Sequence, residues 1–257
     1  TKPSAYHTFD VGMVLDGLVN IYTLTRDEKY LTASRNAAAW LLKYQKDSGA
    51  LAAQISNTGE VVDTPRTWST QSGSYHAKIA MGLLNLFSVT NDEAYKQFAI
   101  RLCDYALTRQ NSDGQFYTYG EEKGSNLHPL FYSAEGLYVA GTFLNEERYT
   151  VAARKAVQWA HANIRDGLLP RHKHDATFNY NERVDILSQG YRLFQIFGLT
   201  GAETESVRTS ILKYQYFGDN VTQHGGFLFG KLSDAAKTNH VNCWVTMFAL
   251  QALLTSG

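Results

Sequence analysis

The feature that most constrains this chain is an internal repeat with a fixed register. Three blocks share one pattern, acidic residues followed by a tyrosine: Asp27-Glu28-Lys29-Tyr30, Asp92-Glu93-Ala94-Tyr95 and Glu146-Glu147-Arg148-Tyr149. Each tyrosine follows a glycine by thirteen residues and precedes a tryptophan or tyrosine by ten. A weaker fourth copy ends at Gly225-Gly226. Repeats of this length predict stacked modules that bury a shared core, so we expect one domain over residues 1–257.

Each repeat is predicted to be a helical hairpin. Apolar residues such as Val11, Leu15 and Leu18 recur at helical spacing, which indicates amphipathic helices. The link between the two helices of a repeat is short, whereas the link to the next repeat is long and polar. This alternation favours a ring, with first helices inside, second helices outside and all long loops on one face. Nine helices are expected, over residues 8–24, 28–46, 74–89, 93–110, 129–143, 147–163, 184–198, 203–216 and 241–255.

The glycines that set the register fall inside the first helix of each repeat, at Gly17, Gly82 and Gly136. Glycine within a helix costs about 1 kcal/mol relative to alanine. We therefore expect all three to lie where neighbouring helices approach closely.

Composition narrows the classes of partner. Lys plus Arg and Asp plus Glu each total 24, so the summed charge argues against partners such as nucleic acid or a membrane surface. No apolar run approaches the roughly 20 residues that span a bilayer, and no signal peptide is visible. Both cysteines fall at helical positions, which does not indicate a disulfide framework.

The first repeat carries the clearest family resemblance. It reads Phe9-Asp10-Val11-Gly12 through Gly17-Leu18, followed by Thr25-Arg26-Asp27-Glu28-Lys29-Tyr30. These stretches resemble bacterial polysaccharide-processing members of the six-hairpin glycosidase superfamily, which includes glycoside hydrolases, unsaturated-uronide hydrolases and polysaccharide lyases. The resemblance implies an all-α (α/α) toroid of helical hairpins in the bacterial cytoplasm or periplasm. Six hairpins need twelve helices, so the ring is incomplete at its N-terminus, has fewer hairpins or stays open.

Two aspartates are the leading catalytic candidates. Asp10 and Asp185 fall in the first turns of inner helices, three repeats apart, which places them on opposite walls of the ring's mouth. Glycoside hydrolysis needs such a carboxyl pair, one as the acid and one as the base or nucleophile. The alternative for each is a helix-capping role.

Histidine and tyrosine residues at the same helix starts support a second chemistry. His76, His128 and Tyr132 could move the proton at C5 of a uronic acid, as a lyase or a C5 epimerase requires. Helix capping or structural hydrogen bonding is the alternative for each histidine.

The remaining candidates are expected to bind the sugar. Arginines would grip a carboxylate with two parallel bonds, aromatic rings would stack on sugar faces, and amide, imidazole and carboxyl groups would supply hydrogen bonds. These residues are Arg66, Trp68, Tyr75, Glu135, Tyr180, Arg183, His240, Asn242 and Trp244.

Metal chemistry is weakly indicated. His172, His174 and Asp175 form a polar loop cluster without a convincing partner pair, so we expect no bound metal and no cofactor. The sequence predicts a carbohydrate-active enzyme that cleaves a glycosidic bond in a uronic-acid-containing saccharide by paired-carboxylate hydrolysis. A polysaccharide lyase or uronate C5 epimerase is the first alternative. A non-catalytic glycan-binding or polysaccharide-assembly protein is the second, and the oligomeric state stays open.

Overall fold

The computed structural model describes residues 5–118, 124–231 and 240–254. Within these ranges the predicted all-α hairpin architecture is confirmed, because the chain forms nine α-helices. Their bounds are α1 Thr8–Thr25, α2 Glu28–Leu42, α3 Ile79–Thr90, α4 Glu93–Leu107, α5 Leu127–Leu144, α6 Glu147–Ala162, α7 Val184–Ile196, α8 Ala202–Leu212 and α9 Cys243–Leu254. Several boundaries differ from the sequence prediction, and three differ by four residues or more. The second helix ends at Leu42 instead of residue 46, α8 ends at Leu212 instead of residue 216, and the first turn expected for α3 is a 3₁₀ helix, Ser74–Lys78.

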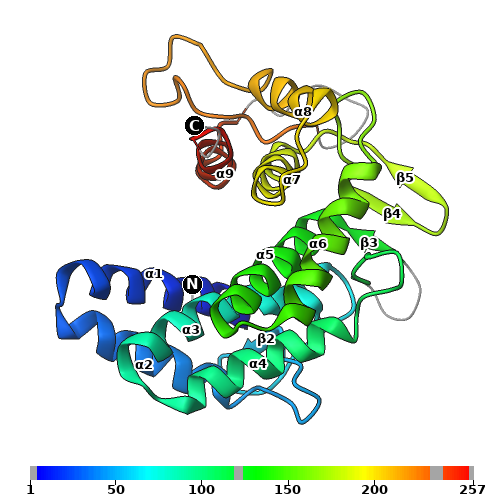
Figure 1. Ribbon diagram of the computed structural model, residues 1–257. Helices are drawn as coiled ribbons and strands as arrows, with labels where there is room; N and C mark the ends of the chain where they lie inside the picture. The colour runs from blue at the N-terminus through cyan, green and yellow to red at the C-terminus, as the bar shows by residue number, and fades with distance from the viewer. Residues whose placement is uncertain (1–4, 119–123, 232–239, 255–257) are drawn as a thin grey trace.

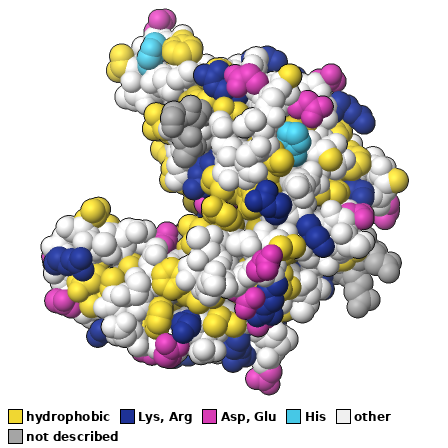
Figure 2. All heavy atoms as spheres, viewed as in Figure 1, with side chains coloured by type: hydrophobic (Ala, Val, Ile, Leu, Met, Phe, Trp, Pro, Cys, Tyr) yellow, Lys and Arg dark blue, Asp and Glu magenta, His cyan; other side chains and the backbone are white. Residues whose placement is uncertain are grey.

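The helices form two layers around an arc (Figure 1). The inner helices α1, α3, α5, α7 and α9 pack in that order, while α2, α4, α6 and α8 each pack outside the inner helix that precedes them. In the described part of the chain α9 and α1 do not pack along their lengths. The arc therefore stays open, and Figure 2 shows a deep notch between its two arms.

The short hairpin turns explain the acidic repeat block. Arg26, Asn91 and Asn145 end α1, α3 and α5 in the left-handed conformation, each donating its backbone N–H to a carbonyl four residues back. In the first two hairpins the next residue is Asp27 or Asp92, whose side chain accepts a backbone N–H of the following helix. These caps satisfy backbone groups that helix ends leave open.

The long loops contain short strands that brace one face of the arc. β1 (Ala5–His7) pairs with β2 (Gln54–Ser56), and β3 (Ser125–Asn126) pairs with β4 (His172–His174), which pairs with β5 (Thr177–Asn179). All these pairings are antiparallel. The first pair leads directly into α1, and β3 leads directly into α5. The strands therefore fix where these inner helices begin.

The glycines that recur at the same position of each repeat show how closely the inner helices pack. A side chain at Gly82 would collide with the backbone of Asp16 on α1, and one at Gly136 would collide with the backbone of Ala77 before α3. The prediction of close approach is confirmed at these two positions. It is wrong at Gly17, where nothing lies within 4 Å, because α1 is at the open end of the arc and no described helix packs against that part of it.

Candidate functional site

The starts of four inner helices surround one cavity of about 340 Å³ on the long-loop face. Its volume falls within the range of small-molecule sites. Seven predicted site residues line it: Asp10 on α1, His128 and Tyr132 on α5, Asp185 on α7, Trp244 on α9, Trp68 at the start of the 3₁₀ helix Trp68–Thr70, and Arg183 just before α7. Residues more than two hundred positions apart in the chain thus meet at the mouth of the arc.

Asp185 is held in a buried ionic cluster. Its side chain is 1% exposed, and the Arg183 guanidinium donates Nε and Nη2 hydrogen bonds of 2.9 and 2.7 Å to its two oxygens. The His128 Nδ1 lies 2.9 Å from the same carboxylate. Burial alone would raise the pKa of Asp185, but His128 and Arg183 outweigh burial and lower the pKa to about 2. This carboxylate therefore stays ionised, and it is not a helix cap, since Arg183 occupies that position.

His128 is oriented by the same cluster. Its Nδ1 faces Asp185 and also lies 2.9 Å from Nε2 of Gln189. The ring packs against Trp68 and Tyr132, with centroids 5.3 and 4.6 Å away. No described residue bonds to the other ring nitrogen, Nε2. A histidine fixed through Nδ1 by a carboxylate presents Nε2 for proton transfer.

Asp10 has the opposite surroundings. It is the third residue of α1 and is exposed. No described residue forms a hydrogen bond or ion pair with its carboxylate, and His7 occupies the cap position. The neighbouring Phe9 packs on Tyr75 and Tyr132, so the helix start is firmly anchored while the Asp10 carboxylate faces the cavity.

Tyr132 contributes a buried hydroxyl to the cavity. The residue is 1% exposed, its hydroxyl makes no hydrogen bond of ordinary geometry with a described residue, and the Trp244 side chain lies beside it. Burial raises the pKa of Tyr132 above its usual range, and the carboxylates of Asp185, Glu135 and Asp10 raise it further. The hydroxyl therefore stays protonated and can donate to a bound sugar.

Three predicted residues lie behind the cavity instead of lining it. His76 is buried with Nε2 3.3 Å from the Thr8 hydroxyl, and burial lowers its pKa to about 3. The Tyr75 hydroxyl donates to the Gln71 carbonyl at 3.1 Å. Both residues support the start of α1 and the loop before α3.

Glu135 is the third predicted residue that lies behind the cavity. It forms ion pairs with Lys78 and with Arg192, the latter at 2.6 Å. These cations outweigh its burial and lower its pKa. All three groups sit on inner-helix segments, so this triad ties the hairpins together about two turns into α5 and α7.

Four further candidates are also outside the cavity lining. The Tyr180 hydroxyl donates to the Asn163 carbonyl at 3.0 Å. Asn242 caps α9 by accepting the Val245 N–H at 3.2 Å. His240 stacks on the cavity residue Phe229, with centroids 5.8 Å apart, and Arg66 is exposed in the loop before α3.

The cavity also contains residues that were not among the sequence candidates. His7, Phe9, Ser69 and Phe229 line it. Phe229 lies 4.1 Å under the Arg183 guanidinium carbon, which holds that cation against the wall. Proximity to Asp10 in the sequence could have indicated His7 and Phe9, whereas Phe229 reaches the site only through the packing of its loop.

Metal-binding residues do not converge in the part of the chain that the structure describes. No three His, Cys, Asp or Glu side chains there could hold a metal ion together. His174 instead pairs with Asp175, with Nδ1 3.1 Å from the carboxylate, and both are well exposed. Among the described helices, none has the length and apolar character needed to cross a bilayer.

The chain forms an arc of helical hairpins, and the starts of its inner helices surround a cavity lined by carboxylate, imidazole and aromatic side chains. Residues 1–147 match the model of Glycosyl Hydrolase Family 88, and the chain belongs to that family. It is thus an enzyme of the class that cleaves glycosidic bonds. The matched region includes Asp10, His128 and Tyr132, whereas Asp185 lies beyond it.

Solved structures with the same fold span several sugar chemistries. Cellobiose 2-epimerase from Bacillus thermoamylovorans is 14% identical with a TM-score of 0.70, over 98% of this chain and 72% of that one. The unsaturated glucuronyl hydrolase of Bacillus sp. GL1 is 13% identical with a TM-score of 0.69, over 96% and 74%. A family 105 glycoside hydrolase from C. acetobutylicum is 16% identical with a TM-score of 0.69, over 96% and 71%. No curated protein sequence matches the chain.

Proposed function

We propose that this chain hydrolyses the glycosidic bond next to a uronic acid, with Asp10 as the carboxyl group that transfers the proton. The observation that carries this proposal is the contrast within one cavity between an exposed carboxylate, Asp10, and an ion-paired one, Asp185. The fold shared with an unsaturated glucuronyl hydrolase supports the choice of a uronide. An oligosaccharide with a terminal unsaturated uronic acid is therefore the first substrate to test.

The ion-paired aspartate has a different role in this proposal. Since its pKa is lowered to about 2, Asp185 cannot donate a proton at neutral pH and is a weak base. It keeps Arg183 and His128 in place at the cavity wall instead. Asp10 lacks such partners, so it is the carboxyl group of the pair that is free to bond to a substrate.

The positive side of the cavity would receive the sugar carboxylate. The Arg183 guanidinium uses one N–H of Nε and one of Nη2 to bond to Asp185. Three N–H donors remain for a substrate, two on Nη1 and one on Nη2. The hydroxyl of Tyr132 and the His128 ring supply further donors close by. Trp68 and Trp244 provide faces and edges for sugar packing.

The reaction is tested by product analysis. Purified protein is incubated with acidic oligosaccharides, with and without a terminal unsaturated uronic acid, and with the matching neutral oligosaccharides. Hydrolysis creates new reducing ends without any rise in the ultraviolet absorbance that a newly formed unsaturated uronide produces. New reducing ends from acidic but not neutral substrates would support the proposal. Cleavage of neutral substrates alone would contradict it.

A second candidate is C5 proton transfer by a lyase or epimerase. The Asp185 and His128 pair favours it, because Asp185 fixes the histidine through Nδ1 and Nε2 has no described partner. Elimination would raise the ultraviolet absorbance, and epimerisation in heavy water would introduce deuterium at the sugar carbon without cleavage. Loss of either signal in His128→Ala, with Asp10→Asn still active, would favour this candidate over hydrolysis.

A further inference from the structure

Three aromatic rings form a row outside the cavity. Trp159 on α6 stacks on Phe178 of β5 with centroids 6.3 Å apart, and Phe178 lies 6.1 Å from Tyr180, which follows β5. All three side chains are half-buried, and none of them lines the cavity. Figure 1 shows β4 and β5 beyond the end of α6, on the side of the arc opposite the notch. The row therefore offers a surface that is separate from the cavity.

Two of these rings each hold a cation. Lys173 of β4 is directly opposite Phe178 in the antiparallel pair, and side chains at opposite positions share one face of a sheet. The Lys173 ammonium accordingly lies over the Phe178 ring, 5.7 Å from its centroid. The Arg165 guanidinium, from the turn after α6, lies over the Tyr180 ring at 4.9 Å. Together with Trp159, these four residues form the cation–aromatic row.

Neither cation of the row forms an ion pair in the part of the chain that the structure describes. The Asp175 carboxylate, two residues after Lys173, pairs with His174 instead. Most cations that lie over rings elsewhere also have a carboxylate partner, as Arg148 has in Asp104. An aromatic face attracts a cation through its quadrupole but carries no net charge. Both cations of the row are therefore held in place while their charge stays available to an anion.

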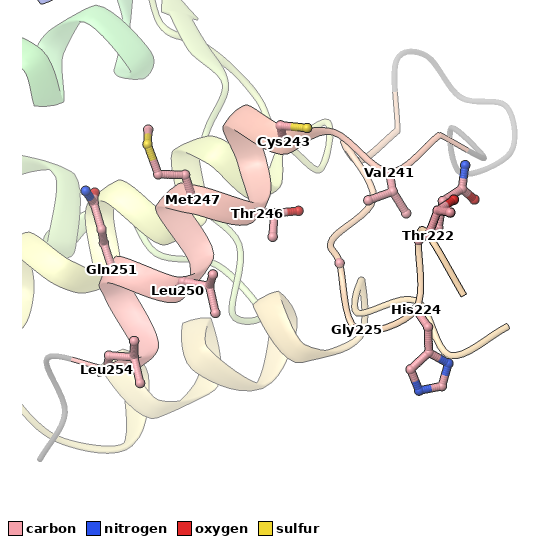
Figure 3. Close-up of a pocket in the computed structure, with 12 residues that line it drawn as sticks. Thr222, His224, Gly225, Val241, Cys243, Thr246, Met247, Leu250, Gln251 and Leu254 are labelled. Atoms are coloured by element: carbon pink, nitrogen blue, oxygen red, sulfur yellow. The ribbon is translucent and has the colours of Figure 1, made fainter. Parts of the chain in front are cut away.

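A groove elsewhere on the chain lacks this combination of charge and rings. It has a volume of about 710 Å³ and lies between α9 and the turn 222–225. Figure 3 shows apolar side chains of α9 along it, among them Met247, Leu250 and Leu254. Its described lining includes no lysine and no arginine. An acidic ligand would lose hydration there without gaining a cation, so charge complementarity favours the cation–aromatic row as a site for anions.

We propose that the cation–aromatic row is a second saccharide site, which binds a chain of uronic acid residues outside the cavity. Its two cations would contact sugar carboxylates, and the exposed parts of its rings would pack against sugar C–H groups. Tyr180 of the row lies three residues before Arg183 of the cavity wall, so one loop segment carries parts of both sites. Two contacts on one chain raise its overall affinity, and long acidic chains should therefore bind more tightly than short ones. This proposal rests on the proposed uronide substrate.

The experiment measures binding of a long oligoglucuronate by titration calorimetry, in an Asp10→Asn background so that the proposed hydrolysis does not consume the ligand. The same chain with its carboxylates reduced to alcohols should bind more weakly, and added salt should weaken only the acidic chain. Lys173→Ala and Arg165→Ala should each lower the affinity for the acidic chain about two- to fivefold. Lys173→Arg keeps the charge and should retain the affinity. Binding of a glucuronate disaccharide, which is too short to reach both sites, should not change in any of these variants.

Arg154→Ala is the matched control and should leave the affinity unchanged. Arg154 also lies over a ring, 5.1 Å from the Phe197 centroid, and also lacks an ion pair among the described residues, but the adjoining Tyr138 ring holds no described cation. Parent affinity in both Lys173→Ala and Arg165→Ala, equal binding of the reduced chain, or equal binding of a single-stranded oligonucleotide would each overturn the second site. If the parent cleaves no acidic saccharide while the two alanine variants bind the long chain more weakly, the proposed hydrolysis fails and the second site stands.

Discussion

Asp10 and Asp185 start equivalent inner helices on two sides of one cavity, yet their carboxylates experience opposite surroundings. The α1 carboxylate is exposed and has no described partner, while the α7 carboxylate is 1% exposed and contacts both Arg183 and His128. The difference arises two residues before each aspartate. Thr8 bonds to the Ala52 carbonyl and leaves Asp10 open, whereas Arg183 folds back onto Asp185.

The two aspartates are suited to different roles, one to positioning other side chains and the other to reacting with a substrate. A carboxylate bonded to Arg183 and His128 is suited to holding these side chains, because its proton affinity is low. A carboxylate without partners keeps the freedom to bond to a substrate. The same repeat position thus supplies a candidate reactive group in one hairpin and a candidate positioning group in another.

The largest expected effect is the loss of catalytic rate in the Asp10→Asn variant. Removing a general acid or base costs a factor of about 100 to 10,000 in rate, while the loss of an exposed, unpaired carboxylate should leave the melting temperature almost unchanged. Turnover on an acidic oligosaccharide and thermal unfolding measure the two quantities. Asp47→Asn, which also changes an exposed carboxylate but lies outside the cavity, is the matched control and should keep its activity. Wild-type turnover in Asp10→Asn would remove Asp10 from the proposed mechanism.

Asp185→Asn should instead act on stability. Breaking a buried ion pair from one side costs about 3 to 5 kcal/mol, because Arg183 keeps its charge in a mostly buried place. Chemical denaturation measures this loss of unfolding free energy. Asp27→Asn is the control, since Asp27 is an exposed helix cap and asparagine caps equally well. If Asp185→Asn unfolds at the same denaturant concentration as the parent, the ionic cluster does not stabilise the fold.

The same cluster predicts a pH dependence. The pKa of Asp185 is lowered from 3.8 to about 2 in the folded protein, so its stabilising contribution is fully present above pH 3.8 and is lost as the pH falls through about 2. The expected loss is about 2 kcal/mol. Because other carboxyl groups titrate in this range, the quantity to measure is the difference in unfolding free energy between the parent and Asp185→Asn. That difference should shrink towards pH 2, and a constant difference would contradict the lowered pKa.

The fold could be predicted from sequence because its signals are local and repeated. The acidic blocks mark hairpin turns, and the left-handed residues Arg26, Asn91 and Asn145 end three inner helices at the expected places. Gly17 shows the limit of this reasoning. It repeats the register of Gly82 and Gly136 but has no helix against it, because a repeat in the sequence does not reveal which copy lies at an open edge.

The candidate site was predictable in position but not in electrostatic state. Helix starts indicated Asp10, Asp185 and His128 as residues of the mouth, and all three line the cavity. The sequence could not show that Arg183 would bond to Asp185 instead of facing a substrate, because two side chains in one short segment have many relative orientations. His76 fails as a cavity residue because the whole 3₁₀ turn Ser74–Lys78 lies behind the cavity, where the His76 ring faces the Thr8 hydroxyl at the start of α1.

The smallest expected effect is the loss of unfolding free energy in Arg183→Lys, which tests whether the paired hydrogen bonds to Asp185 stabilise the fold beyond the charge itself. Arg183→Lys keeps the positive charge but replaces two parallel hydrogen bonds with a single ammonium contact and loses the planar stacking on Phe229. Since one net hydrogen bond to a charged group contributes about 1.5 to 3 kcal/mol and the ammonium retains part of it, we expect a loss of about 1 kcal/mol in unfolding free energy. Arg208→Lys, in an exposed pair with Glu205, should change stability by less, because exposed ion pairs contribute about 0 to 1 kcal/mol. If the two variants lose the same unfolding free energy, a positive charge near Asp185 is sufficient for stability and the paired hydrogen bonds add nothing to it. A larger loss for Arg183→Lys, with the pH dependence of Asp185 retained, would show that charge sets the pKa while geometry adds stability.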